Sequence, residues 1–197
     1  DIECQLTREK DIFASLNYRT NYANGRKADA LISVHINSAG STAANGFESF
    51  VYTTDGDSSK SVALQKKLHP ALARLWTNKG RKDRGKKKAN FHMVREFKGA
   101  AVLLEFGFIV NDRDAALLKQ DIFLQDNAEA MADAAAGYFG VTKGVTKPAK
   151  PDAAAGIYRV IVEQKQVAAY SHIPNLVAEV ENAVRAGKHE VKIELVK

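Results

Sequence analysis

Two polar side chains interrupt apolar, strand-like runs near their carboxyl ends. His35 lies in ADALISVHINSAG, residues 28–40, whose centre is typical of a buried strand, and Glu105 lies in AAVLLEFGFI, residues 100–109. A neutral imidazole is a good zinc ligand, and a buried carboxyl group with a raised pKa is a good general base or acid. The two residue types together indicate metal-assisted or acid–base chemistry.

Each residue also has a structural interpretation. A single histidine in an apolar strand is often a hydrogen-bonded core residue, and a single buried glutamate is often ion-paired, here with Arg84 or Arg95 as candidate partners. In open α/β sheets, however, ligands bind at the carboxyl ends of strands, and both residues lie near such ends. The residues and their spacing leave the two interpretations open.

Strand-like and helix-like patterns alternate along the first part of the chain. The strand candidates are residues 31–36, 46–52, 91–94 and 100–109. The helix candidates are residues 17–28, a segment that begins at Ser58 and contains Pro70, and residues 121–138. This alternation predicts an α/β fold with a twisted, mostly parallel sheet flanked by helices. Proline lacks a backbone N–H, so Pro70 is expected to kink or split its helix.

The composition changes at VTKGVTKPAKPDAAAG, residues 141–156, which contains two Lys-Pro pairs, many small residues and no aromatic residue. Such a segment is typical of a linker, so we expect a main domain over residues 1–140. Residues 157–197 predict a small ββαβ module, which is marginal for folding alone and is expected to dock or to self-associate.

The charge of the chain is positive. Its 197 residues are 45% hydrophobic and 26% charged and carry a formal net charge of +6, which suggests an anionic partner. KGRKDRGKKK, residues 79–88, reads as a solvated basic loop beside the site, or as a segment that attracts anions. It lacks interleaved aromatic residues, so nucleic acid is not expected. No apolar run is long enough to span a membrane. Cys4 is the single cysteine, so the chain cannot form an internal disulfide, and Cys4 is expected in the core.

A resemblance extends this interpretation. LTREKD, NYRTNYAN, ADALISVHINSAG, GFESFVY, DRGKKKANFHMVRE and AVLLEFGFIVN occur in the order seen in zinc-dependent N-acetylmuramoyl-L-alanine amidases. Roughly residues 2–140 resemble the bacteriophage lysin and Bacillus autolysin branch of that family. The tail beginning at Tyr158 is similar to the small carboxyl-terminal module of some Bacillus phage amidases, which is associated there with cell-wall binding.

The resemblance implies roles for particular residues. His35 corresponds to the last zinc ligand of a His-Glu-His set, and Glu105 corresponds to the catalytic glutamate. Zinc would polarise the amide carbonyl and acidify a bound water, whose proton Glu105 would pass to the departing amine. Asn37 and Arg95 are candidates for substrate binding. The expected reaction cleaves the bond between N-acetylmuramic acid and L-alanine in peptidoglycan.

The chain departs from the family pattern in one respect. The family's first zinc ligand, in a Gly-His-Gly-Gly turn, and its glutamate ligand are absent from this sequence, so the catalytic domain is expected to be incomplete at its amino-terminal side. Zinc at a catalytic centre needs about three protein ligands. The substitutes by residue type are Glu3, Glu9, Glu48, His69 and His92. We therefore expect little amidase activity from this chain alone, and the alternative function is a non-catalytic cell-wall-binding protein.

The expected partners follow from the same resemblance. They are peptidoglycan and an anionic cell-wall polymer, with no nucleic acid and no membrane, and the small module offers a surface for self-association. The expected place of action is the bacterial cell wall, reached either outside the cell or on release from the host cytoplasm during lysis.

Overall fold

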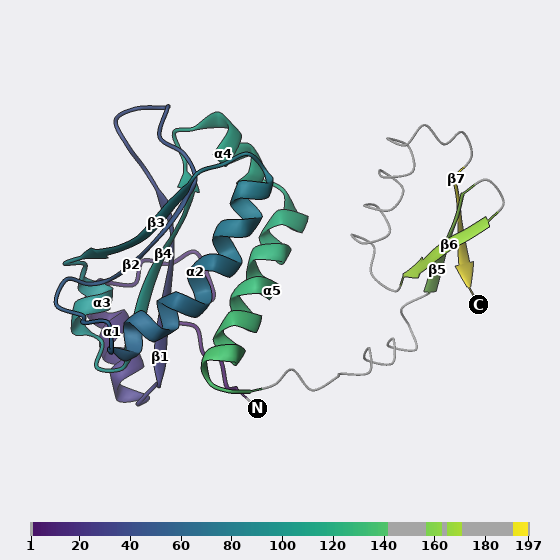
Figure 1. Ribbon diagram of the computed structural model, residues 1–197. Coiled ribbons are helices and arrows are strands. Elements are labelled where there is room, and N and C mark those ends of the chain that lie inside the picture. The colour runs from purple at the N-terminus through teal and green to yellow at the C-terminus, as the bar shows by residue number, and fades with distance from the viewer. Residues whose placement is uncertain (1, 142–156, 163–164, 171–190, 197) are drawn as a thin grey trace. The chain divides into compact units, whose positions relative to one another are not determined.

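The computed structural model describes residues 2–141, 157–162, 165–170 and 191–196. The chain divides into two compact units, Asp1–Lys143 and Gly144–Lys197. The first unit is an α/β domain in which helices flank a central sheet, as the sequence predicts (Figure 1).

The sheet of the first unit has four strands in the order β1-β4-β2-β3. Their bounds are Ala30–Asn37 for β1, Phe47–Tyr52 for β2, Asp83–Ala89 for β3 and Ala100–Phe108 for β4. β1 pairs with β4 and β2 pairs with β3 in parallel, whereas β2 and β4 are antiparallel. The sheet is therefore mostly parallel, and β4, which is buried on both faces, has the near-continuous apolar sequence that such a strand needs.

Five helices accompany the sheet. They are α1 (Leu16–Gly25), α2 (Lys60–Asn78), α3 (His92–Glu96), α4 (Asp112–Leu118) and α5 (Asp121–Tyr138). α2 and α5 lie side by side over one face of the sheet, and α1 and α3 pack on the other face (Figure 1). The helices and strands thus form three layers.

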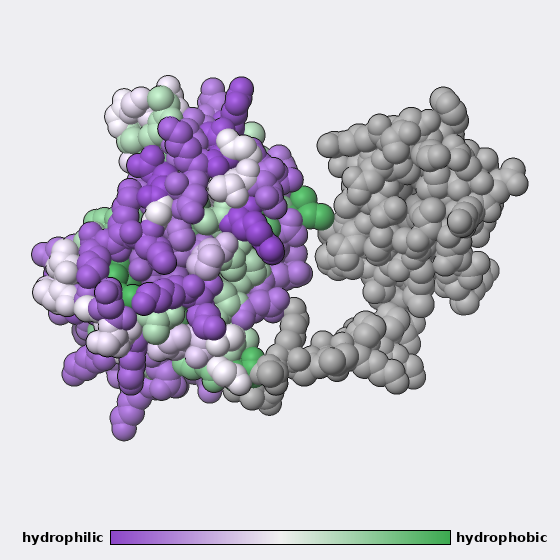
Figure 2. Space-filling model, in the orientation of Figure 1, coloured by the Kyte–Doolittle hydropathy of each residue, from purple (hydrophilic) through white to green (hydrophobic). Residues whose placement is uncertain are grey.

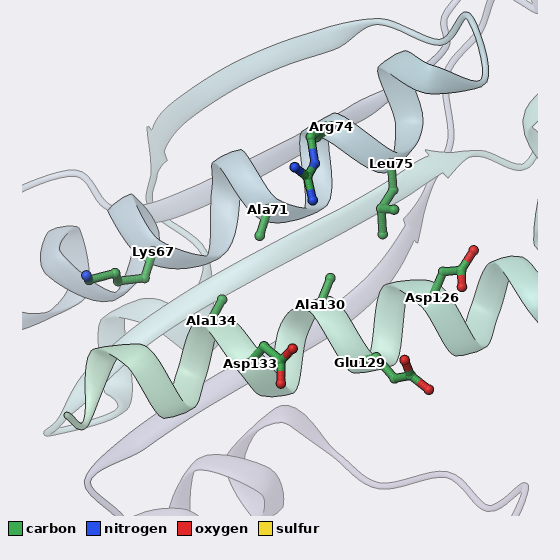
Figure 3. Close-up of a pocket in the computed structure, with 9 residues that line it drawn as sticks. All are labelled: Lys67, Ala71, Arg74, Leu75, Asp126, Glu129, Ala130, Asp133 and Ala134. Carbon is green, nitrogen blue, oxygen red and sulfur yellow. The ribbon is translucent and has the colours of Figure 1, made fainter. Parts of the chain in front are cut away.

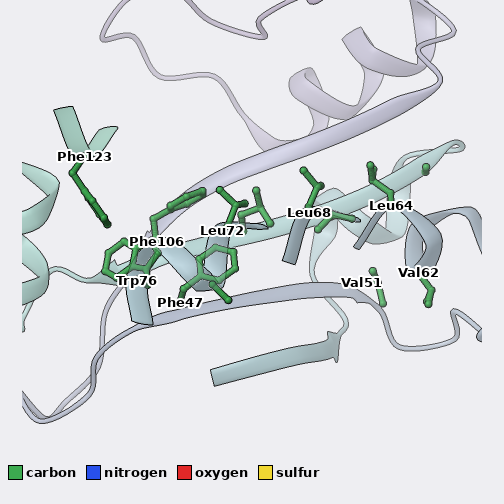
Figure 4. Close-up of a cluster of buried hydrophobic side chains, with 13 residues drawn as sticks. Phe47, Val51, Val62, Leu64, Leu68, Leu72, Trp76, Phe106 and Phe123 are labelled. Carbon is green, nitrogen blue, oxygen red and sulfur yellow. The ribbon is translucent and has the colours of Figure 1, made fainter. Parts of the chain in front are cut away.

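The main core lies between the sheet and helices α2 and α5. Leu64, Leu68, Leu72 and Trp76 form a fully buried stripe along α2, and β4 supplies Val102, Leu104 and Phe106 from the sheet (Figure 4). Each large side chain buried here stabilises the fold by about 1.5–3 kcal/mol. A smaller cluster on the opposite face consists of Ala23, Val94, Phe97, Ala101 and Leu103.

α2 continues without a break through Pro70, so the expectation of a split helix is wrong. The hydroxyl of Ser59 caps its start by accepting a hydrogen bond from the Val62 amide at 3.1 Å. A proline removes a single hydrogen bond from a helix interior, whereas the apolar stripe packs both before and after Pro70. Tertiary packing therefore holds the two halves as one helix.

Other local expectations are also corrected. FHMV, residues 91–94, is not a strand but contributes to α3, because four residues are too few to distinguish alternation from a helical turn. Most of the basic segment 79–88 is not a loop, since residues 83–88 belong to β3. β1 is partly exposed rather than buried, because it forms an edge of the sheet. Cys4 is exposed and lies outside the core.

The second unit contains a three-stranded antiparallel sheet in the order β6-β5-β7. Its strands are β5 (Ile157–Val162), β6 (Lys165–Tyr170) and β7 (Val191–Val196). They match the three strands of the predicted ββαβ module. The predicted helix of that module, and all but the first residue of the predicted linker 141–156, lie outside the described residues.

The first unit presents a mainly hydrophilic surface on the side where α2 and α5 lie, with smaller apolar areas between the polar side chains (Figure 2). Among the described residues, no helix has the length and apolar character needed to cross a membrane.

Candidate active site

His35 and Glu105 occupy opposed positions on neighbouring parallel strands. They are direct partners in the β1–β4 register, near the carboxyl ends of both strands. Leu31 on β1 and Leu103 on β4 pack in the cluster on the α1 side of the sheet, and alternation carries His35 and Glu105 to that same face. The structure therefore brings together the two residues that the sequence singled out.

The surroundings of His35 favour its neutral form. One ring nitrogen, Nε2, lies 2.9 Å from the hydroxyl of Ser33 on the same strand. Burial, and after it the positive charge of Arg19 on α1, lower the pKa of His35 below its ordinary value. A neutral imidazole with one nitrogen anchored by a hydrogen bond is the form in which histidine binds metals.

Glu105 has an unusual environment for a carboxyl group. Burial, followed by the negative charge of Glu48, raises its pKa to about 7. Its Oε2 atom is buried and has no hydrogen-bond partner among the described residues. The alternative in which Glu105 pairs with Arg84 or Arg95 is wrong, because Arg84 pairs with Glu48 and Arg95 with Glu96. A buried acceptor with no partner is costly, so it marks a place for a proton, a water or a ligand.

Glu48 lies directly across the β2–β4 pair from Glu105 and is almost completely buried. Three donors surround its carboxylate: Asn37 Nδ2 at 2.6 Å, Arg84 Nε at 3.0 Å, and the Lys87 ammonium group. Sequence reasoning considered Glu48 only as a substitute metal ligand. It is instead an ion-paired neighbour, and it carries the same sequence signal as Glu105, an acidic residue inside an apolar strand.

A bulge at the end of β4 redirects the next side chain toward this face. Gly107 has a φ of +70°, and a Cβ atom there would lie 2.5 Å from Trp76, so only glycine fits. The β1–β4 register shifts at this point, and Phe108 comes to lie under Arg84, whose guanidinium carbon is 4.7 Å from the ring centre. Strict alternation would have placed Phe108 with the main core.

The candidate substrate-binding residues fall into different surroundings. Asn37 belongs to the site, because its amide donates to Glu48. Arg95 lies on α3, where its guanidinium donates to the Glu96 carboxylate at 2.6 Å and to Asn90 Oδ1 at 2.7 Å. Arg95 makes no described contact with His35 or Glu105, so its role in binding stays a prediction.

The described residues do not by themselves form a zinc centre. Within them, no group of three histidine, cysteine, aspartate or glutamate side chains is placed to hold a metal ion. His69 lies between Ser49 Oγ at 2.8 Å and Asp83 Oδ1 at 3.0 Å, next to Phe47 of the main core, and His92 contacts Thr20 Oγ1 at 3.3 Å. Among these three histidines, His35 is the one that lies opposite Glu105 in the strand register.

A buried ion pair ties together the loops beside the strand ends. Asp114 is fully buried and accepts from Arg81 Nε at 2.6 Å and from the backbone amides of Gly46 at 2.8 Å and Phe108 at 3.0 Å. Asn111 caps α4 and also accepts a hydrogen bond from Arg81. This network fixes the start of β2, the end of β4 and α4 relative to one another.

A hollow lies elsewhere, between the antiparallel helices α2 and α5 (Figure 3). Lys67 and Arg74 face it from α2, and Asp126 and Glu129 face it from α5. Alanine side chains form much of its floor. It contains neither His35 nor Glu105, and its opposite charges belong to two packed helices, so we assign it no chemistry.

The sequence of the chain is similar to those of known amidases. A family model described as N-acetylmuramoyl-L-alanine amidase matches residues 1–136. An endolysin of Bacillus phage SPP1 is 40% identical over 154 residues, which is 77% of this chain and 56% of the relative. The amidase LytC of Bacillus subtilis is 37% identical over 134 residues, covering 68% of this chain and 26% of the relative.

The fold is similar to that of a solved amidase domain. The catalytic domain of CwlV, an N-acetylmuramoyl-L-alanine amidase from Bacillus (Paenibacillus) polymyxa var. colistinus, superposes with a TM-score of 0.65 at 35% identity. That likeness covers 71% of this chain and 74% of the other. The chain therefore shares both sequence and fold with amidase catalytic domains, while spanning about half or less of the two curated relatives.

Proposed function

Because the chain belongs to the N-acetylmuramoyl-L-alanine amidase family, we propose that it acts in peptidoglycan hydrolysis, on the amide bond between N-acetylmuramic acid and L-alanine. The observation that carries the proposal is the opposed pair of His35 and Glu105, with one buried Glu105 oxygen left without a partner. The resemblance alone suggests the substrate, and this pair supplies the chemistry.

Glu105 serves as the proton carrier in this proposal. A carboxyl group whose pKa is about 7 is poised near neutral pH to accept a proton and to release it again. Glu105 takes a proton from the water that attacks the amide carbonyl, and it gives that proton to the departing amine of L-alanine. Both steps need a carboxyl oxygen that has no hydrogen-bond partner. Oε2 of Glu105 is such an oxygen among the described residues.

Zinc remains part of the proposal, with a restriction. His35, neutral and held by Ser33, is suited to be one ligand, but the described residues provide no group of three ligands. Zinc binding at a catalytic centre therefore requires further ligands from outside the described residues.

The second unit and the basic segment 79–88 are proposed to hold the protein on its substrate. The resemblance of the tail to a wall-binding module supports binding to peptidoglycan or to an anionic wall polymer, and self-association through this unit is a further proposal. Tethering raises the local concentration of a catalytic domain at a polymeric substrate. The place of action would be the bacterial cell wall, whether reached from outside the cell or on release during lysis.

The test is a digestion of purified Bacillus cell walls, followed by measurement of newly exposed amino-terminal alanine. The chain alone is expected to release little. A chimera that places the amino-terminal amidase segment of the phage SPP1 endolysin before residue 1 is expected to release alanine in a zinc-dependent manner.

The decisive variants are made in that chimera. Glu105→Gln is expected to lower the rate by about 10²–10⁴-fold, the usual contribution of a general acid–base group. Glu129→Gln, an exposed glutamate on α5, is the matched control and should leave the rate unchanged. A zinc-loaded chimera that releases no alanine, or a fully active Glu105→Gln variant, would contradict the proposed function.

The alternative is that the chain is a non-catalytic cell-wall-binding protein. One observation favours it, the lack of a group of three metal ligands among the described residues. In that case the chimera would sediment with cell walls but release no alanine, so the same assay separates the two functions.

A further inference from the structure

A cationic pair lies over the buried Glu48 carboxylate, on the same face of the sheet as Glu105. Arg84 and Lys87 both pair with Glu48, and Asn37 adds a neutral donor. Because two cations pair with one carboxylate, the cluster of Arg84, Lys87 and Glu48 carries an excess positive charge. The side chains of Arg84 and Lys87 are 30% and 38% exposed, whereas that of Glu48 is 5% exposed. The excess charge therefore faces the solvent.

Arg84 is oriented before any ligand arrives. Its Nε atom donates to Glu48, and its guanidinium carbon lies over the Phe108 ring, 4.7 Å from the ring centre. Neither terminal nitrogen of Arg84 has a hydrogen-bond partner among the described residues. An arginine held at Nε and by contact with an aromatic ring loses little conformational freedom on binding, and its two terminal nitrogens suit the two oxygens of a carboxylate.

The order of the strands gives the distance between Arg84 and Glu105. β4, β2 and β3 are successive strands, and neighbouring strands lie about 4.8 Å apart, so the two residues are separated by about 10 Å across the sheet. An extended peptide advances about 3.3–3.6 Å per residue. A peptide whose first amide lies at Glu105 therefore brings its second or third residue to Arg84.

We propose that Arg84, with Lys87 beside it, binds a carboxylate on the second or third residue of the peptide stem. This inference rests on the proposed function, because it assumes that the scissile amide lies at Glu105. Arg84 and Lys87 then determine specificity, since they distinguish a free carboxylate from its uncharged carboxamide. Glu48 is a positioning residue that holds both cations in place.

The test is calorimetric titration of the full chain with pairs of muramoyl peptides. The two members of a pair differ only in carrying a carboxylate or a carboxamide on the second residue, or on the third. The wild-type chain is expected to bind one carboxylate peptide about 10-fold more tightly than its carboxamide partner, as a charge-assisted hydrogen bond allows. Arg84→Gln should abolish this preference, and Arg84→Lys should retain part of it because the charge remains.

Lys86→Gln is the matched control. Lys86 lies on the same strand but faces the α2 side, where its charge acts on His69, so its loss removes the same charge without touching the pair. This control should keep the full preference, and circular dichroism should show that all variants are folded.

Equal binding of both members of each pair by the wild-type chain, no binding of any peptide, or a preference that survives in Arg84→Gln would overturn the inference. Binding requires no hydrolysis. Its failure is therefore separate from failure of the proposed function, which is judged by alanine release in the chimera.

Discussion

Asp114 and Glu105 are both acidic residues of the first unit, and they differ in how the fold satisfies their carboxyl oxygens. Asp114 has a donor for each oxygen, from the Arg81 guanidinium and from two backbone amides. The Glu105 carboxyl group faces the negative charge of another carboxylate, Glu48, and one of its oxygens has no partner among the described residues. The first acid is fully satisfied by the fold, and the second is not.

The difference separates an acid that supports the fold from one that is available for chemistry. A satisfied buried ion pair fixes geometry, and breaking it leaves a buried charge uncompensated. An unsatisfied carboxyl group costs stability, and a fold retains such a cost at sites where the group acts on a ligand. The comparison therefore predicts that substitutions at the two residues change stability in opposite directions.

The largest effect is expected from Asp114→Asn. This change leaves Arg81 buried with no counter-charge, so it should lower the free energy of unfolding by about 3–5 kcal/mol. Urea unfolding, followed by the fluorescence of Trp76, measures it, since Trp76 is the single tryptophan of the chain and lies in the main core. The control is Asp126→Asn, which removes an exposed acid from α5 and should change stability by less than about 0.5 kcal/mol.

A smaller effect of opposite sign is expected from Glu105→Gln. The unfolded chain ionises Glu105 near pH 4.5 and the folded chain near pH 7, so the folded state binds more protons between these values and loses stability as the pH rises through them. At pH 8, without metal, the variant should be about 1–2 kcal/mol more stable than the wild type, with allowance for solvent screening. At pH 4 the two should be equal.

Thermal unfolding of both proteins at the two pH values checks this expectation. A variant that is less stable than the wild type at pH 8 would show that Glu105 makes a favourable interaction in the fold. The distinction from Asp114 would then be lost.

The parts of the molecule that follow a repeating pattern could be predicted from sequence. The continuous apolar run of residues 100–109 predicted β4 correctly, and the apolar pattern of residues 31–36 predicted the strand that carries His35. The failures occurred where a local exception decides the outcome. FHMV is too short to define a period, packing carries α2 through Pro70, and the bulge at Gly107 reverses the direction of Phe108.

The site was predicted only in part for a different reason. Sequence order shows which residues lie on a strand, but it does not show which strands are neighbours. Glu48 meets Glu105, and Arg84 meets Glu48, only because β2 lies between β4 and β3. The acidic residue inside GFESFVY was a readable signal. The basic segment 79–88 offered no strand pattern, so its sequence favoured a solvated loop or an anion-attracting segment and did not predict its pairing with β2.

The central claim is that Glu105 is an uncompensated acid whose proton is available near neutral pH, and carbon-13 NMR titration of its carboxyl group tests it most directly. The account predicts a pKa of about 7 in the metal-free wild-type chain. It also predicts a lower value in Glu48→Gln that stays above 4.5, because burial contributes more to the shift than the Glu48 charge does. A wild-type Glu105 that titrates near 4.5 would contradict the account.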